Sequence, residues 1–173
     1  APGPEMKSTG EVYGSDISAD IAYLKARLAT EVPVASEGGV YLTVRNEDKE
    51  GLVSIAEELF DLGFTLYATP GTADVLRSSN IEVTTAYRIN DRKHPDALDL
   101  MRRGDISFIV NVPTISGGAV RDGNMMRRLA VELNIPFVTT IRGARMETAA
   151  IRALIEKEIT PRKLEVHYDS KFL

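Results

Sequence analysis

The sequence contains no cysteine and only two histidines. The absence of cysteine excludes a disulfide scaffold, a thiolate metal site and a cysteine nucleophile, and it fits a reducing compartment. We therefore expect a cytoplasmic protein. With so little histidine, the chain offers few side chains for general acid or base catalysis near neutral pH.

The chain also lacks an apolar run near the ~18 residues that a membrane-spanning helix needs. It has no basic start followed by an apolar segment, so we expect neither a membrane span nor a signal peptide. Basic residues are not in excess, because 21 Lys and Arg stand against 25 Asp and Glu. A general nucleic-acid surface needs clustered Lys and Arg and is disfavoured, whereas a local site for a small anion is compatible with this charge.

What the sequence does contain is ordinary globular composition, with 43% hydrophobic residues in a chain of 173. This length fits one domain with its own core. Ile21, Leu24 and Leu28 recur at helical spacing, with Ser18 in the N-cap position, so a short helix precedes the main domain. We divide the chain into an N-terminal tail, helix and linker (residues 1–36) and a single α/β domain (residues 37–173).

From residue 39 onward, short strands rich in β-branched residues alternate with amphipathic helices. Alternation of this kind predicts a doubly wound, five-stranded parallel sheet with helices on both faces and right-handed crossovers. The predicted strands are 40–44, 64–68, 81–87, 106–112 and 137–141, with a short extra strand at 164–168. The predicted helices lie between them, including one with Pro95 at its first position and a last one at 144–159.

Ligands of such sheets bind outside the carboxyl ends of the strands, which selects the loop after the second strand. Thr69, Gly71 and Thr72 lie there, where a strand ends, a glycine follows and a helix begins. Backbone N–H groups at a helix start, flanked by two hydroxyls, can hold a phosphate or a carboxylate. The alternative is structural, with Thr72 as a plain N-cap and Gly71 only turning the chain.

The loop after the fourth strand is the second candidate. Asn111 offers a donor and an acceptor, and Thr114, Ser116 and Gly117–Gly118 have the composition of an anion-binding nest. The alternative for this segment is a flexible loop. Lys49 after the first strand and Arg88 after the third would add positive charge at the same sheet edge, although loop cations are usually solvated.

Catalytic signatures are scarce. His94 follows the third strand and could act as a general acid, or it is an exposed loop histidine, which its charged neighbours favour. No nucleophile elbow, zinc-protease motif, phosphate-binding P-loop or dinucleotide fingerprint occurs. We therefore assign no catalytic residue, no metal and no cofactor to this chain.

Four segments resemble the methylglyoxal synthase-like domain, a Rossmann-type family: residues 43–49, 63–72, 106–111 and 126–137. The resemblance covers about residues 39–158. Within that family the chain is most similar to the C-terminal allosteric domain of the carbamoyl phosphate synthetase large subunit. Residues 3–12 resemble the segment that closes the second ATP-grasp unit of that subunit, and the helix after them resembles the connector into the allosteric domain.

This resemblance implies a regulatory piece of a glutamine-hydrolysing ligase of pyrimidine and arginine biosynthesis. The parent enzyme would use ATP and Mg, and its remaining large subunit and glutaminase small subunit would be partners. Effector nucleotides such as UMP and IMP would bind through seven positions: Lys49, Thr69, Gly71, Thr72, Arg88, Asn111 and Thr114. Ornithine would contact the fifth strand at Phe137 and Thr139, although Phe137 lacks the hydroxyl of the tyrosine in bacterial relatives.

Two other functions remain open at this point. One is the lyase activity of methylglyoxal synthase on dihydroxyacetone phosphate. Its Gly-Gly-Asp run is replaced here by Arg92-Lys93-His94, and the histidine of its second loop has no counterpart around residues 111–121. Asp91 and Asp96 are near the first of these positions but do not match it. The other possibility is a structural or oligomerisation domain without a ligand.

Overall fold

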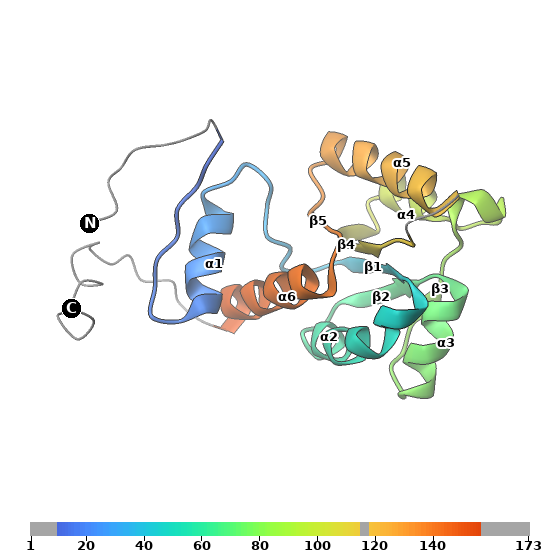
Figure 1. The fold of residues 1–173 in the computed structure, drawn as a ribbon, viewed down its shortest axis with the longest axis horizontal. Helices are drawn as coiled ribbons and strands as arrows, with labels where there is room; N and C mark the ends of the chain where they lie inside the picture. Colours follow the sequence, from blue (N-terminus) through green and yellow to red (C-terminus); the bar gives the residue numbers. More distant parts are fainter. Residues whose placement is uncertain (1–9, 115–117, 157–173) are drawn as a thin grey trace.

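The computed structural model describes residues 10–114 and 118–156 of the chain. It contains one five-stranded parallel sheet with the strand order β3-β2-β1-β4-β5 (Figure 1). In register, Tyr41 lies opposite Tyr67 on one side and Ile109 on the other. The predicted doubly wound α/β fold is therefore confirmed. The strands are β1 (Gly39–Val44), β2 (Thr65–Ala68), β3 (Thr84–Thr85), β4 (Ile106–Val112) and β5 (Phe137–Val138).

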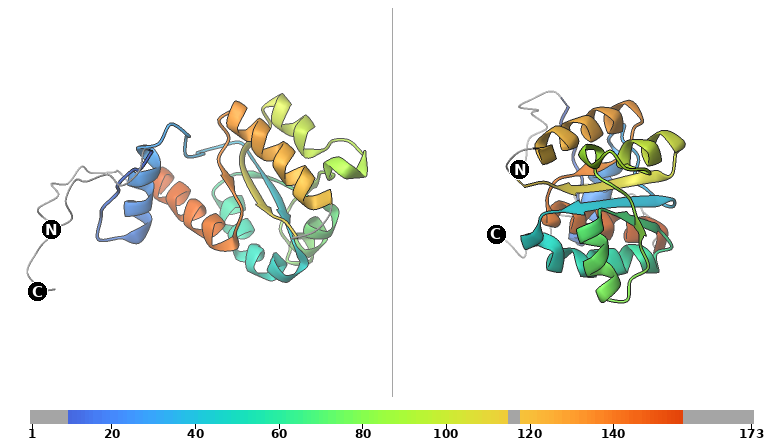
Figure 2. Two further views of the ribbon diagram at one scale, coloured as in Figure 1. Left: turned by 45° about the horizontal axis from the view of Figure 1, so that its top comes forward. Right: turned by 90° about the vertical axis from the view of Figure 1, so that its right-hand side faces the viewer.

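Helices cover both faces of this sheet (Figure 2). One layer holds α2, α3 and α6, the other holds α4 and α5, and α1 lies beyond the sheet against α6. The amphipathic patterns in the sequence produce this arrangement, since each helix buries one apolar stripe. The helices are α1 (Ala19–Leu28), α2 (Lys49–Asp61), α3 (Pro70–Ser78), α4 (Ala97–Arg103), α5 (Gly118–Glu132) and α6 (Ile141–Glu156).

Alternating side chains of the central strands build two separate cores. Leu42 and Val110 face α2, α3 and α6, whereas Tyr41 and Ile109 face α4 and α5. All four are almost completely buried. Full burial of one large apolar side chain contributes about 1.5–3 kcal/mol, so this alternation fixes the strand register.

The edge strands are shorter than the sequence predicts. Residues 81–87 form a ladder only at Thr84–Thr85, and Ile141 begins α6 rather than ending a strand. An edge strand has one neighbour, so fewer hydrogen bonds hold it in register than hold β1 or β4. The start of α6 is fixed instead by Thr140, whose hydroxyl accepts the Gly143 N–H at 3.0 Å.

One predicted helix start is also wrong. Pro95 precedes α4 rather than occupying its first position, because Asp96 is the N-cap and its side chain accepts the Asp99 N–H at 2.9 Å. At its other end, α4 terminates at Gly104, with φ +79°, as expected for a glycine C-cap. The end of the predicted last helix and the predicted strand at 164–168 lie outside the described residues.

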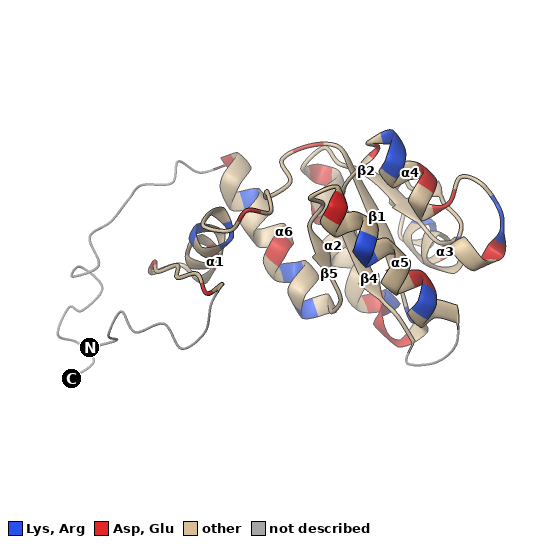
Figure 3. Ribbon diagram, turned by 90° about the horizontal axis from the view of Figure 1, so that it is seen from above, with Lys and Arg blue, Asp and Glu red and all other residues tan. Residues whose placement is uncertain are grey.

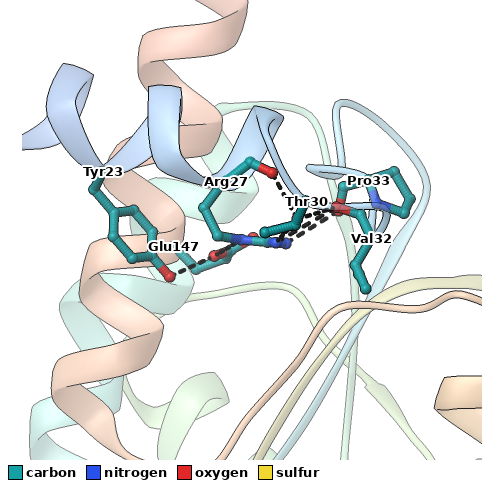
Figure 4. Close-up of polar contacts among 6 residues, drawn as sticks. All are labelled: Tyr23, Arg27, Thr30, Val32, Pro33 and Glu147. Atoms are coloured by element: carbon teal, nitrogen blue, oxygen red, sulfur yellow. Dashed lines mark hydrogen bonds and ion pairs between the residues drawn. The ribbon is translucent and has the colours of Figure 1, made fainter. Parts of the chain in front are cut away.

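Helix α1 is joined to α6 by a buried polar cluster (Figure 4). The carboxylate of Glu147 accepts hydrogen bonds from the Tyr23 hydroxyl at 2.9 Å and from Arg27 Nε and Nη2, each at 2.9 Å. Arg27 also donates to the hydroxyl of Thr30 and to the carbonyl of Pro33. These bonds hold α1 and the following linker on α6. The proposed boundary at residue 36 stays a prediction.

Charges of both signs are interspersed over α4, α5 and α6 (Figure 3). Positive charge at any one site must therefore come from individual side chains rather than from a basic face. Among residues 10–114 and 118–156, none of the helices combines the length and the hydropathy needed to span a bilayer.

Candidate functional site

A pocket of about 230 Å³ opens at the carboxyl ends of β1 and β4. This is the position where the strand order reverses, since β2 and β3 follow β1 on one side and β4 and β5 lie on the other. The loops after two such strands diverge and leave a crevice, as in other doubly wound sheets. All seven residues predicted to hold an effector line this pocket: Lys49, Thr69, Gly71, Thr72, Arg88, Asn111 and Thr114.

Two buried hydroxyls lie where β2 passes into α3. The Thr69 hydroxyl donates to the Thr72 hydroxyl at 3.2 Å, and only 3% and 1% of these residues are exposed. Thr69, not Thr72, occupies the N-cap position, and its side chain makes no capping hydrogen bond. The interpretation of Thr72 as a plain N-cap is therefore wrong. Pro70 has no N–H and the Thr72 N–H donates to the Thr69 carbonyl, so Gly71 is the residue whose N–H the first turn leaves for a ligand. Gly71 and both threonines line the pocket, which is an arrangement suited to an anion.

Three cationic side chains line the pocket, and one of them, Arg45, is paired with Asp48, which leaves Lys49 and Arg88 as sources of positive charge. Lys49 is the first residue of α2, and its Nζ would lie 3.0 Å from a Cβ placed on Gly71. Arg88 is exposed and reaches the pocket from the end of the third strand segment. Within the described parts of the chain, neither cation forms an ion pair with a carboxylate, so their charge is not neutralised there.

The loop after β4 supplies a side-chain amide. Asn111 is 4% exposed and lies beside Thr43 in the β1–β4 ladder. Its Nδ2 packs against helix α5 at Gly123, where an added Cβ would come within 2.8 Å. Thr114 is exposed at the rim of the pocket. The nest predicted at Ser116 and Gly117 lies outside the described residues.

Among the pocket-lining residues that were not predicted from the sequence, three bring polar groups from the strands and from α5: Tyr41, Thr43 and Asp122. The Thr43 hydroxyl lies 3.5 Å from that of Thr69 and extends the hydroxyl cluster onto β1. Two patterns in the sequence could have pointed to these residues. Tyr41 and Thr43 alternate along a strand that ends at the site, and Asp122 shares a buried helical stripe with Met126 and Ala130.

Asp122 and Tyr41 form a wall on the α4–α5 side of the pocket. Asp122 is 5% exposed, and its Oδ2 accepts the Asn90 N–H at 3.2 Å. Burial raises the pKa of the Asp122 carboxyl, and neighbouring Asp91 adds to the shift. The Tyr41 hydroxyl donates to the Tyr87 carbonyl at 3.4 Å, and burial, together with the Asp122 charge, raises its pKa as well.

The structure separates the remaining candidates from this pocket. Phe137 and Thr139 line a second pocket of about 750 Å³, together with Arg27, Arg127 and Glu147. The Arg127 guanidinium lies over the Phe137 ring at 5.5 Å from its centroid.

His94 is exposed and pairs with Asp99, and this bond raises the pKa of the His94 imidazole. It is not among the residues that line the first pocket, and neither are Asp91 and Asp96. An exposed loop histidine is thus the interpretation of His94 that fits its position.

The pocket can therefore bind a small anion at one side and hydrogen-bonding groups at the other. Threonine hydroxyls, the starts of α2 and α3 and the Lys49 ammonium gather at the side suited to an anion. Arg88 lies nearer to Asp122 and Tyr41, whose pKa values its charge lowers. Its one buried carboxylate, Asp122, has no histidine beside it in the pocket lining. Acid–base catalysis on a bound phosphate ester would need a positioned pair of groups.

Comparison with known proteins identifies the family of the chain. The family model of the MGS-like domain matches residues 51–139, just over half of the chain. The match includes six of the seven predicted effector residues, and Lys49 lies just before it. The expected methylglyoxal synthase-like family is thereby confirmed.

Relatives from methanogenic archaea resemble almost the whole chain. The C-terminal section of the carbamoyl phosphate synthase large chain of Methanocaldococcus jannaschii is 42% identical over 164 residues, which is 94% of this chain and 26% of that protein. The corresponding section of Methanopyrus kandleri is 42% identical over 158 residues, 91% of this chain and 29% of the relative. The carbamoyl phosphate synthase large chain of Methanosarcina acetivorans is 40% identical over 156 residues, which is 90% of this chain and 14% of that protein.

These relatives are several times longer than the stretch that matches. The chain spans less than a third of each of them, yet at least nine-tenths of the chain takes part in every one of these matches. The similarity thus includes α1 and its linker as well as the sheet. Because the family model matches more than half of the chain, the chain belongs to the MGS-like domain family.

Proposed function

We propose that this chain is an effector-binding regulatory domain that holds a nucleoside monophosphate, such as UMP or IMP, in the pocket between β1 and β4. The observation that carries the proposal is the convergence of Thr69, Thr72 and Lys49 on one side of that pocket. The Thr69 hydroxyl donates to Thr72, which leaves the Thr72 hydroxyl hydrogen for a ligand. Beside it, the Lys49 ammonium pairs with no carboxylate of residues 10–114 and 118–156, and the two groups together favour a phosphate. Asn111 offers an amide for the rest of the ligand.

The proposal extends to a parent enzyme because the similar relatives are carbamoyl phosphate synthase large chains. In that setting the domain would act on the ATP- and Mg-dependent ligase of pyrimidine and arginine biosynthesis, in the cytoplasm. Its partners would be the remainder of the large subunit and the glutaminase small subunit. An effector changes such an enzyme only if its affinity differs between two conformations of the whole assembly.

Ornithine is a weaker candidate ligand for the second pocket. Thr139 supplies one hydroxyl there, but Phe137 supplies none, and the guanidinium of Arg127 covers its ring. A fixed cation at that position repels the ammonium groups of ornithine. We therefore propose nucleotide control rather than ornithine control for this chain.

The lyase alternative rests on one observation, the buried carboxylate of Asp122 in the pocket. Elimination of phosphate also needs a proton donor, and the pocket lining contains no histidine for this role. Measuring phosphate release from dihydroxyacetone phosphate tests this alternative directly. Release at an appreciable rate would replace the regulatory proposal with an enzymatic one.

Calorimetric titration of the chain with UMP, IMP, ornithine and N-acetylglutamate tests the proposal itself. We expect binding of a nucleotide and a loss of about 1–3 kcal/mol of binding free energy in Thr69→Ala and in Lys49→Ala. Thr139→Ala, outside the pocket, is the matched control for the nucleotides and should bind UMP and IMP as the unchanged protein does. Absence of binding by every compound would favour a structural domain, and unchanged affinity in both pocket variants would refute the placement of the site.

A further inference from the structure

Arg152 of α6 lies between the carboxylates of two other helices. Its Nη1 is 2.6 Å from Oε1 of Glu58 on α2, and its Nη2 is 3.6 Å from Oδ2 of Asp20 on α1. The three side chains are between 30% and 39% exposed, so the cluster lies at the surface of the helical layer. One guanidinium therefore ties α1 to α2 by way of α6.

The contact between Arg152 and Glu58 is close but poorly aligned. Oε1 of Glu58 is buried and accepts no hydrogen bond from residues 10–114 and 118–156, although Nη1 of Arg152 is next to it. A guanidinium can form two parallel hydrogen bonds with one carboxylate when no other acceptor competes for it. Here the carboxylate of Asp20 competes. The guanidinium thus has two alternative partners, and a small shift of either helix changes which one it bonds.

The other end of α2 lies in the effector pocket. Lys49 is the first residue of α2 and lines that pocket, whereas Glu58 is in the second half of the same helix. A rise of 1.5 Å per residue puts the two residues about 14 Å apart along the helix axis. A helix moves as a rigid element, so a displacement of Lys49 is carried to Glu58. An anion that attracts the Lys49 ammonium therefore acts on the helix that holds Arg152.

Polar contacts of two kinds hold helix α1. Tyr23 and Arg27 bind the buried carboxylate of Glu147, which lies on α6. Asp20, in the first turn of α1, instead reaches Arg152, whose guanidinium also contacts α2. The Glu147 contact is therefore independent of α2, whereas the Asp20 contact responds when α2 moves.

We infer that Arg152 is a switch between the effector pocket and α1. A bound nucleotide draws α2 along its axis toward the pocket, so that Arg152 leaves Glu58, bonds Asp20 and holds α1 more firmly. This deepens the proposed function and rests on it, because it names the element that responds to the effector. In the longer chain of that function, α1 would lie between this domain and the preceding part of the large subunit.

Hydrogen exchange of the α1 amides, with and without saturating UMP or IMP, tests the switch on this chain. Exchange of residues 19–28 should slow by about threefold when nucleotide binds, the size expected for a partly exposed ion pair. This response should vanish in Arg152→Gln. Arg145→Gln removes an exposed cation from the same helix, and it should keep the response as the matched control.

Nucleotide affinity, measured by calorimetry, provides the reciprocal test, because linkage makes each event change the other by the same factor. Asp20→Asn should raise the Kd for UMP by about two- to fivefold, since the bound state loses its new ion pair. Glu58→Gln should lower the Kd, because it removes the competing carboxylate. Neither residue lines the pocket. Glu57→Gln, at an exposed position of α2, should leave the Kd unchanged.

The outcomes separate this proposal from the proposed function. Thermal unfolding shows whether each variant is folded, and the opposite shifts of Asp20→Asn and Glu58→Gln decide the matter if Arg152→Gln is not. If UMP or IMP binds but α1 exchange and both affinities stay unchanged, or shift in the same direction, the switch is refuted and the effector function stands. If neither nucleotide binds the unchanged protein, both proposals fall.

Discussion

The ammonium group of Lys49 lies directly over the backbone of Gly71, so closely that a Cβ on Gly71 would stand 3.0 Å from Nζ. The two residues come from the first turns of α2 and α3, which follow β1 and β2. Parallel neighbouring strands bring both helix starts to the same sheet edge. The absence of a side chain at residue 71 is what lets the cation lie against the start of α3, where Thr69 and Thr72 also line the pocket.

Gly71→Ala should therefore weaken phosphate binding without unfolding the protein. The new methyl group would push the Lys49 ammonium away, and part of the charge-assisted contact, on the order of 1 kcal/mol, should be lost. Titration with UMP or phosphate measures the effect. Gly51→Ala is the matched control, because its Cβ would meet Ile141 at an ordinary 3.4 Å and leave Lys49 in place. Equal affinities in both variants would contradict this relationship.

Gly123→Ala should disturb the other side of the same pocket. Its Cβ would lie 2.8 Å from Nδ2 of Asn111, a distance that forces the amide to move. We expect nucleotide affinity to fall about tenfold, because a misplaced amide loses its hydrogen bond to the ligand. Affinity for inorganic phosphate should change little. If the variant binds nucleotide normally, the amide of Asn111 is not a ligand.

Glu147→Ala should be among the most destabilising single changes in the chain. The side chain of Glu147 is only 2% exposed, and its removal leaves Arg27, 16% exposed, without its carboxylate and Tyr23 without its acceptor. Breaking one side of a buried ion pair typically costs about 3–5 kcal/mol. Urea unfolding measures this free energy.

The surface pair of Asp74 and Arg77 provides the control for that experiment. Its side chains are 75% and 46% exposed, and Asp74→Ala should cost at most about 1 kcal/mol. Similar costs for the two variants would show that the Glu147 cluster is not what holds α1 on α6.

Asp122 should make the stability of the unliganded protein depend on pH. Because burial raises its pKa above the usual 3.8, the folded protein holds this proton more tightly than the unfolded chain. The resulting stabilisation is fully present below pH 3.8 and is lost as the pH rises through the folded pKa. Asp122→Asn removes this dependence.

Unfolding midpoints of the two proteins across this range check the expectation. Asp122→Asn should gain stability relative to the unchanged protein at neutral pH, and the difference should fade in acid. A difference that does not change with pH, or one of opposite sign, would show that Asp122 is not desolvated in solution.

Much of the fold could be predicted from local pattern. The apolar run of β4 and the helical spacing of Leu52, Ile55 and Leu59 lead directly to central elements, because burial on both faces leaves a clear periodic signal. The edge strands β3 and β5 were predicted too long. Ile81 and Ile141 are β-branched like the residues of the central strands, but they have no neighbouring strand to pair with. β-propensity describes a fit to a pleated surface, and the surface must exist for the strand to form.

The candidate site, like the fold, could be predicted from the sequence only in part. The composition of the loop with Thr69, Gly71 and Thr72 is enough to indicate an anion site, and its place at a strand end directs attention to the other strand ends. Which side chains share one cavity depends instead on three-dimensional packing, which puts Phe137 in another pocket and brings Asp122 into this one. The periodicity of a strand or helix determines the face on which a residue lies. What that face meets is set by how α5 packs across β4, because residues far apart in the chain must come together there.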